Sequence, residues 1–201
     1  MKIIGITGRS GCGKSTVSDW LRQQGFPIVD TDQVARDIME PGSPCLAQLA
    51  EQFGPQILRP DGTLRRRHLA NLAFSTEEGT RALTSITHPE ILRRTLAQRD
   101  KACAAGAELF FLDGAVLVNS MFQSYCDTMV VVTAPFETSV ERICHRDGIS
   151  PEMAARRLNA QLPEDILREH ADFVLENDQT PEHLVQLTRD LLDQLRKEPH
   201  A

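Results

Sequence analysis

The sequence predicts a three-layer α/β fold in which a parallel sheet lies between helices. Short apolar runs recur along the chain with helical patterns between them, and a glycine-rich turn joins the first run to a helix. The later runs at 108–113 and 129–133 are rich in Phe, Leu and Val, as expected of parallel strands that are covered on both faces.

The N-terminal part of the chain reads as two pairs of strand and helix. Residues 2–7 form the first predicted strand, 8–13 a glycine-rich turn, and 14–24 a helix that Gly25 stops. A second apolar run at 26–30 ends in an acid, and 31–39 continues as a helix that ends before Pro41. The acids at 30 and 32 are therefore expected at a corner between strand and helix.

The middle of the chain, from 43 to about 106, is mostly helical, with breaks at 53–55, 60–62 and His88-Pro89. This is more helix than one crossover needs, so it predicts an inserted helical subdomain. Two short helices around Gly148 predict a small helical lid at about 136–170, followed by a strand at 173–175 and a C-terminal helix. We expect a single domain over 1–201, with its core at about 1–42, 107–135 and 171–197.

Length and charge exclude several classes of function. A chain of 201 residues can hold one α/β domain with insertions, and its formal net charge of −6 gives no overall attraction to nucleic acid or to an anionic membrane. The first apolar stretch meets the glycine-rich turn at once, so neither a signal peptide nor a membrane span is expected. The 5 cysteines lack metal-ligand spacing and suit reduced thiols. We expect a cytoplasmic protein.

The glycine-rich turn carries the strongest chemical signal. Residues 8–15, Gly-Arg-Ser-Gly-Cys-Gly-Lys-Ser, match the P-loop pattern G-x-x-x-x-G-K-[ST] between a predicted strand and a predicted helix. Backbone N–H groups of such a loop cradle phosphates, Lys14 reaches the β- and γ-phosphates, and the Ser15 hydroxyl binds Mg²⁺. The sequence therefore predicts an ATP-dependent phosphotransferase with ATP as co-substrate and Mg²⁺ as cofactor.

A kinase also needs a carboxylate beside the acceptor hydroxyl, to orient it and accept its proton. Asp30 and Asp32 are the candidates, and they face the same way only if the second strand extends through Asp32. A helix N-cap is the alternative role for Asp32.

Arginines are the second group of candidates. Arg142 and Arg146 share one face of a predicted helix, and their forks suit the charge on a transferred phosphoryl group. A solvated basic face is the alternative. The run at 65–67, Arg-Arg-Arg, also has two interpretations. It binds an acceptor's phosphates, or it is an ordinary surface cluster.

Three further residues have two interpretations each. Asp113 ends a strand and is a candidate Mg²⁺ ligand of the Walker B kind, or else an aspartate in a turn with Gly114. His88 precedes a proline and is a structural histidine or a secondary site residue. Cys12 is a small filler of the loop, or a reactive thiol whose pKa is lowered by Lys14 and the helix end.

Taken together, these motifs resemble those of dephospho-CoA kinases, which phosphorylate the ribose 3′-hydroxyl of dephospho-CoA in the last step of coenzyme A synthesis. The resemblance extends in order and spacing over nearly the whole chain. It is carried by Ile-Gly-Ile-Thr-Gly before the P-loop, Val29-Asp30-Thr31-Asp32, Val34-Ala35-Arg36, Phe53-Gly54, Asp61-Gly62-x-Leu64-x-Arg66, His88-Pro89-x-Ile91, Arg142-x-x-x-Arg146-Asp147, Gln161, and Ala171-Asp172-x-Val174 with Asn177.

The resemblance implies a role for each site residue. Asp32 is the general base, while Lys14 and Arg142 act on the transferred phosphate. The implied ATP site comprises Gly8, Gly11, Cys12, Gly13, Lys14, Ser15, Thr16, Arg142 and Arg146, with Ser15 and, as a second candidate, Asp113 toward Mg²⁺. The implied substrate site comprises Asp32, Arg36, Arg66 and His88, and the inserted helices at about 43–106 form the implied CoA-binding region. ATP and dephospho-CoA are the implied partners of a monomer or weak homo-oligomer.

Four departures from the family's pattern concern the acceptor site more than the ATP site. Arg9 replaces a loop glycine, 115–119 lack the family's proline and acid (Ala115, Asn119), Arg65 replaces an aspartate, and Leu167 replaces a basic residue. A P-loop kinase for another small hydroxyl acceptor, such as a nucleoside monophosphate, is the second hypothesis. A GTPase-like switch is a third, although no N-K-x-D guanine motif is present, and a weak relative that only binds nucleotide is a fourth.

Overall fold

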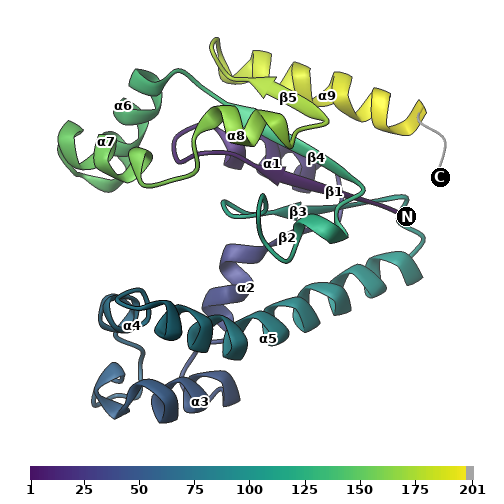
Figure 1. Ribbon diagram of the computed structural model, residues 1–201. Coiled ribbons are helices and arrows are strands. Elements are labelled where there is room, and N and C mark those ends of the chain that lie inside the picture. Colours follow the sequence, from purple (N-terminus) through teal and green to yellow (C-terminus); the bar gives the residue numbers. More distant parts are fainter. Residues whose placement is uncertain (198–201) are drawn as a thin grey trace. The chain divides into compact units, whose positions relative to one another are not determined.

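The computed structural model describes residues 1–197 of the chain (Figure 1). Five strands form one sheet in the order β2-β3-β1-β4-β5. Their bounds are β1 Lys2–Thr7, β2 Ile28–Asp30, β3 Leu109–Asp113, β4 Thr128–Thr133 and β5 Phe173–Glu176. The pairs β1·β3, β1·β4 and β4·β5 are parallel, which confirms the predicted fold class.

Helices connect the strands. They are α1 Lys14–Gln23, α2 Thr31–Asp37, α3 Pro44–Phe53, α4 Arg66–Ala73, α5 Glu77–Ala104, α6 Phe136–Asp147, α7 Pro151–Asn159, α8 Glu164–Glu169 and α9 Pro181–Lys197, with 3-10 turns η1 Pro55–Ile57 and η2 Gln123–Tyr125. The sequence did not predict α8, because six residues are too few to show a helical period. Within residues 1–197, no helix is long and apolar enough to cross a membrane.

One hydrophobic core covers a face of the sheet. Strand residues such as Ile4, Phe111 and Val132 pack with Leu21 of α1 and with leucines of α9. The α9 leucines in this core are Leu184, Leu191, Leu192 and Leu195, so the predicted packing of the C-terminal helix on the sheet is confirmed. Each fully buried side chain of this size contributes roughly 1.5–3 kcal/mol, which holds the strand that leads into the P-loop.

The end of α1 explains why β2 starts later than predicted. Gly25 has a φ of 85°, its N–H donates to the Arg22 carbonyl at 3.0 Å, and the Phe26 N–H donates to the Leu21 carbonyl at 3.1 Å. This pair of bonds is a Schellman cap, and it uses the N–H that Phe26 would offer to the sheet. The predicted strand at 26–30 therefore begins only at Ile28.

The predicted helix break at His88-Pro89 is wrong, because α5 runs through Pro89 without interruption. A proline inside a helix lacks the N–H that would bond to the carbonyl four residues earlier, at a cost of about 3 kcal/mol. The helix is anchored beyond the proline by buried side chains, since Ile91 is 8% exposed and Thr95 is 2% exposed. Tertiary packing therefore overrides the local signal.

The chain divides into two compact units. One comprises Met1–Val29 and the chain from Ala102 onward, and the other is Asp30–Lys101. In the second unit, Ser43 caps α3 through its hydroxyl, which accepts from the Leu46 N–H at 3.1 Å. Most of the helical insert predicted at 43–106 falls in this unit. The roles assigned to the insert and to the lid at 136–170 stay predictions.

Candidate active site

The P-loop joins β1 to α1, and two of its glycines have backbone conformations that other residues rarely adopt. Gly11 has a φ of 79°, and Gly13, the N-cap of α1, has a φ of 98°. A Cβ on Gly11 would lie 2.6 Å from the Ser139 carbonyl oxygen, and a Cβ on Gly13 would collide with the amide of Asn177. The loop therefore has both the curvature and the close packing that require glycine.

The first turn of α1 holds the other predicted phosphate ligands. The N–H of Thr16 donates to the Gly13 carbonyl at 2.9 Å, so Thr16 lies inside the helical turn. Ser15 is exposed at the same end of the helix. Gly8, at the start of the loop, lies against the Val132 carbonyl of β4. The structure thus places the P-loop residues in one strand-turn-helix unit, as the pattern predicted.

Three side chains from late in the sequence fix the backbone of the loop. Gln161 accepts from the Ser10 N–H at 2.9 Å and donates to the Ser10 hydroxyl at 3.2 Å. Asn177 is buried and donates to the Cys12 carbonyl at 2.8 Å. Arg142 of α6 donates to the Gly11 carbonyl at 3.1 Å. Sequence reasoning gave Gln161 no role and named Asn177 only by analogy, as a candidate for reading the adenine of ATP, although both belong to the segments that carry the family resemblance.

Arg9, which departs from the family's glycine, has a structural place in the loop. Its Nη2 donates to the Leu158 carbonyl at 2.6 Å, in the last turn of α7. Its guanidinium also lies over the Phe136 ring, 5.9 Å from the centroid. A cation at a helix C-terminus is favoured by the helix dipole, so the arginine joins the loop to α7.

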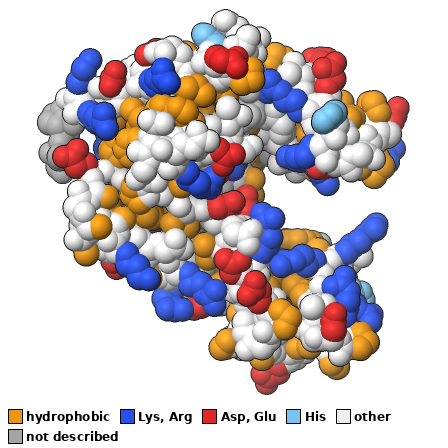
Figure 2. Space-filling view, turned by 180° about the vertical axis from the view of Figure 1, so that it is seen from behind, with side chains coloured by type: hydrophobic (Ala, Val, Ile, Leu, Met, Phe, Trp, Pro, Cys, Tyr) orange, Lys and Arg blue, Asp and Glu red, His pale blue; other side chains and the backbone are white. Residues whose placement is uncertain are grey.

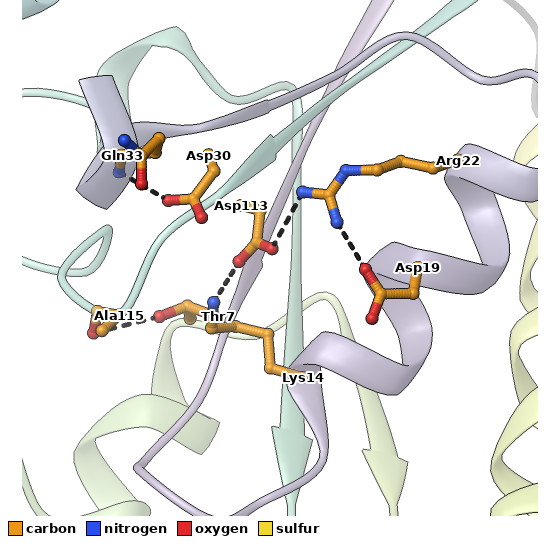
Figure 3. Close-up of polar contacts among 8 residues, drawn as sticks. All are labelled: Thr7, Lys14, Asp19, Arg22, Asp30, Gln33, Asp113 and Ala115. Carbon is orange, nitrogen blue, oxygen red and sulfur yellow. Dashed lines mark hydrogen bonds and ion pairs between the residues drawn. The ribbon is translucent and has the colours of Figure 1, made fainter. Parts of the chain in front are cut away.

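The predicted phosphate-binding lysine and the candidate magnesium ligand form an ion pair (Figure 3). The Lys14 ammonium donates to Oδ1 of Asp113. Asp113 lies at the end of β3 and is only 3% exposed. Figure 3 shows Arg22 of α1 on the other side of Asp113, with Nη2 3.8 Å from Oδ2. The Asp113 carboxylate therefore lies between two cations, and its place beside Lys14 favours the site interpretation over a simple turn.

Asp30, not Asp32, is the cap of α2. The strand β2 ends at Asp30, whose Oδ1 accepts from the Gln33 N–H at 2.9 Å (Figure 3). Asp32 lies in the first turn of the helix, and its own carbonyl accepts from Arg36 Nε at 3.2 Å. The N-cap alternative for Asp32 is therefore wrong. The strand does not extend through Asp32, so the condition under which Asp30 and Asp32 would face the same way is not met.

The two candidate arginines of α6 differ in their surroundings. Arg142 is half-buried against the P-loop. The Arg146 side chain is 58% exposed and forms a fork with Asp147, with Nε at 2.7 Å and Nη2 at 3.0 Å from its oxygens. Hydrogen bonds from Arg146 lower the pKa of Asp147 to about 2, and Arg157 also donates to that carboxylate. The structure brings Arg142 to the P-loop and places Arg146 in a surface ion pair.

Cys12 does not have the environment of a reactive thiol. It is 2% exposed, and burial raises the pKa of its thiol to about 11, although Lys14 and a backbone hydrogen bond act in the opposite direction. The suggestion that the loop makes this cysteine reactive is therefore wrong. Its role is to fill space behind the loop.

We expect Cys12 to resist alkylation. At pH 8, a thiol with a pKa of about 11 is only ~0.1% thiolate, and burial also blocks the reagent. Iodoacetamide should therefore label the exposed Cys103 first, with Cys12 slower by at least ~100-fold. Peptide mass spectrometry over time would measure both rates in the native protein, and equal rates would contradict the burial of Cys12.

The predicted acceptor residues lie in the second unit. Arg66 Nη2 donates to the Arg36 carbonyl at 3.5 Å, so these two predicted substrate residues are neighbours. His88 lies in α5, half-buried, and burial lowers its pKa. A histidine with a lowered pKa is mostly neutral near pH 7. This suits a hydrogen-bonding role better than a charge-based one.

A model of the dephospho-CoA kinase family matches residues 2–182. The chain belongs to the dephospho-CoA kinase family. Among curated relatives, dephospho-CoA kinase of Corynebacterium glutamicum is 45% identical over 181 residues, which cover 90% of either protein. Dephospho-CoA kinase of Anaeromyxobacter dehalogenans is 41% identical over 98% of this chain and 93% of the relative. The predicted family and enzyme class are confirmed, and a kinase for dephospho-CoA is favoured over one for another acceptor.

Solved structures agree on the fold. The protein TT1252 from Thermus thermophilus has a TM-score of 0.83 and 36% identity, covering 96% of this chain and 97% of that one. Dephospho-CoA kinase from Campylobacter jejuni has a TM-score of 0.71 and 24% identity over 98% of each chain. A shikimate kinase from Acinetobacter baumannii, at 16% identity, has a TM-score of 0.51 over 98% of this chain and 93% of that one. This member of the dephospho-CoA kinase family therefore has the fold of P-loop kinases.

Proposed function

We propose that the chain transfers the γ-phosphate of ATP to the ribose 3′-hydroxyl of dephospho-CoA, giving CoA and ADP in the last step of coenzyme A synthesis. The observation that carries the proposal is the P-loop of this family member, fixed by Arg142 at Gly11 and continued by Lys14 into the ion pair with Asp113. ATP and dephospho-CoA are the proposed small-molecule partners.

Lys14, Ser15 and Arg142 are the residues that we assign to ATP. The backbone N–H groups of the loop and the N-terminus of α1 favour the phosphates. The Lys14 ammonium, now paired with Asp113, would exchange part of that contact for the β- and γ-phosphate oxygens. Arg142 has five N–H donors, so its bond to Gly11 leaves others for the transferred phosphoryl group.

Asp32, Arg36, Arg66 and His88 are the residues that we assign to dephospho-CoA. Asp32 would orient the 3′-hydroxyl and take its proton as the bond to phosphorus forms. Its support is its position in the first turn of α2, where Asp30 supplies the capping hydrogen bond. The guanidinium of Arg66 lies at the Arg36 backbone, where Nη2 donates to the Arg36 carbonyl at 3.5 Å, and this supports a shared role of the two residues toward the acceptor's phosphate groups.

Magnesium fits the residues present. Mg²⁺ keeps several waters and binds through one or two protein oxygens together with substrate phosphates. The exposed Ser15 hydroxyl and the Asp113 carboxylate would hold it directly or through water. When bound, the ion neutralises charge on the β- and γ-phosphates.

The proposed setting is a cytoplasmic monomer or weak homo-oligomer. The support for the compartment is that Cys12, Cys45, Cys103, Cys126 and Cys144 are free thiols in the structure, as is usual in a reducing compartment. Light scattering of the purified protein at two concentrations would give the oligomeric state, and a stable dimer at both would contradict the monomer.

ADP release by the purified protein tests the function. We would supply MgATP with and without dephospho-CoA, and with AMP, adenosine or shikimate as competing acceptors. Stimulation by dephospho-CoA alone is expected, with a product of the mass of CoA and a phosphorus NMR signal of a 3′-phosphomonoester. Turnover with another acceptor and none with dephospho-CoA would refute the proposed substrate. Nucleotide binding without any turnover would instead support the hypothesis of a catalytically weak relative that only binds nucleotide.

A further inference from the structure

The second unit carries a basic surface pocket of about 620 Å³ at the start of α4. Arg59, Arg65, Arg66, Arg67, His68 and Asn71 line it. Four of the lining residues are arginines, and none of the lining residues in the described part of the chain is acidic. Figure 2 shows Lys and Arg side chains gathered over the part of the chain that holds α3 and α4. The pocket is therefore a concentration of positive charge in a chain whose net charge is −6.

A short hairpin before α4 fixes the positions of these arginines. The Arg59 N–H donates to the Thr63 carbonyl at 2.8 Å, and the Arg65 N–H donates to the Ile57 carbonyl at 2.7 Å. Asp61 closes the turn, since its carboxylate accepts from the Thr63 N–H at 3.0 Å and hydroxyl at 2.6 Å. Arg59 and Arg65 are thus held on opposite sides of a rigid turn.

The side chain of Arg59 is itself ordered by the hairpin. Its Nη1 donates to the Thr63 hydroxyl at 3.2 Å and to the Leu64 carbonyl at 3.1 Å. The backbone under the pocket is anchored because Leu64 is 6% exposed and Leu69 is 4% exposed. The pocket therefore presents guanidinium groups from a fixed frame, which reduces the entropy lost when a ligand binds.

Four arginines that line one pocket carry the same charge, and a ligand with more than one negative charge offsets it. Arginine forks match pairs of phosphate oxygens, and the volume lies within the range of small-molecule pockets. We propose that this pocket binds a diphosphate group. If the proposed function holds, on which this assignment rests, the diphosphate group belongs to dephospho-CoA. Free pyrophosphate is the other ligand that carries such a group.

Calorimetric titration with inorganic pyrophosphate tests the pocket without catalysis. The P-loop would first be filled with Mg²⁺ and a non-hydrolysable ATP analogue, so that it does not compete. The wild type is expected to bind pyrophosphate, and the pair Arg65→Gln with Arg67→Gln should weaken binding by about 10- to 100-fold, because two charge-assisted bonds are lost. Their side chains are exposed, so we expect the melting temperature to stay unchanged.

A matched control removes the same charge elsewhere in the unit. Arg81 and Arg99 are partners of Glu77 and Asp100 along α5 and are not among the described lining residues. The pair Arg81→Gln with Arg99→Gln should leave pyrophosphate binding within about twofold. Equal binding by the wild type and both pairs, or equal weakening in both, would overturn the proposal.

Steady-state kinetics then distinguishes the two sources. A rise of about tenfold in the KM for dephospho-CoA, with kcat unchanged, in the variant of Arg65 and Arg67 assigns the pocket to the acceptor's diphosphate. An unchanged KM together with lost pyrophosphate binding supports a site for free pyrophosphate. No turnover of dephospho-CoA by the wild type refutes the proposed function, and the titration still decides the pocket.

Discussion

Replacement of Asp32 by asparagine is expected to lower turnover by about two to four orders of magnitude, the range for loss of a general base. Asparagine keeps the size and hydrogen-bonding capacity of the side chain, but its amide cannot accept the proton of the acceptor hydroxyl. The helix should be unaffected, because Asp30 supplies the capping bond to the Gln33 N–H. ADP release at saturating substrates measures kcat, and fluorescence titration with an ATP analogue should show near-normal affinity.

Asp37→Asn is the matched control for this experiment. Asp37 lies at the other end of α2, and its carboxylate accepts from the Gln33 side chain at 2.6 Å on the surface. Loss of one such bond leaves turnover within about twofold. A near-wild-type rate for Asp32→Asn would remove Asp32 from the mechanism, and the proton would then have to leave through solvent.

The parts of the molecule that local sequence determines were predicted well. The first strand, Lys2–Thr7, has the predicted bounds, and Gly25 stops α1 as expected. A buried strand, a glycine with positive φ and a P-loop each have a signature within a few residues. Lys14 and Asp113 form an ion pair, and both were candidates. Lys14 was one because it is the lysine of the P-loop motif, and Asp113 because it ends a strand.

The fixing of the P-loop could not be predicted in the same way. Asn177 and Cys12 are 165 positions apart, and Gln161 and Ser10 are 151 apart. An amide that donates to a backbone carbonyl has no local motif, so only the fold reveals its partner. The pKa of Cys12 was misjudged for the same reason, because the thiol belongs to the buried core with Val130 and Val132 of β4, whereas the adjacent Lys14 alone would activate it.

Replacement of Arg142 by alanine is expected to lower kcat by about 10²- to 10³-fold, the effect of losing a donor to a developing negative charge. The KM for ATP should change only a few-fold, because the P-loop backbone and Lys14 still bind the phosphates. Arg142→Lys keeps the charge without the planar fork, so it should recover only part of the activity. The kcat and KM of all three proteins, measured by ADP release, check this result.

A structural role for Arg142 would give a different pattern. The bond to the Gly11 carbonyl contributes about 1 kcal/mol, so its loss alone lowers the melting temperature by a few degrees and leaves kcat nearly unchanged at low temperature. Arg156→Ala is the matched control, because Arg156 is exposed on the neighbouring helix α7. If Arg142→Ala lost stability but kept kcat, the arginine would only position the loop. The negative charge on the transferred phosphate would then be stabilised by Lys14 and Mg²⁺ instead.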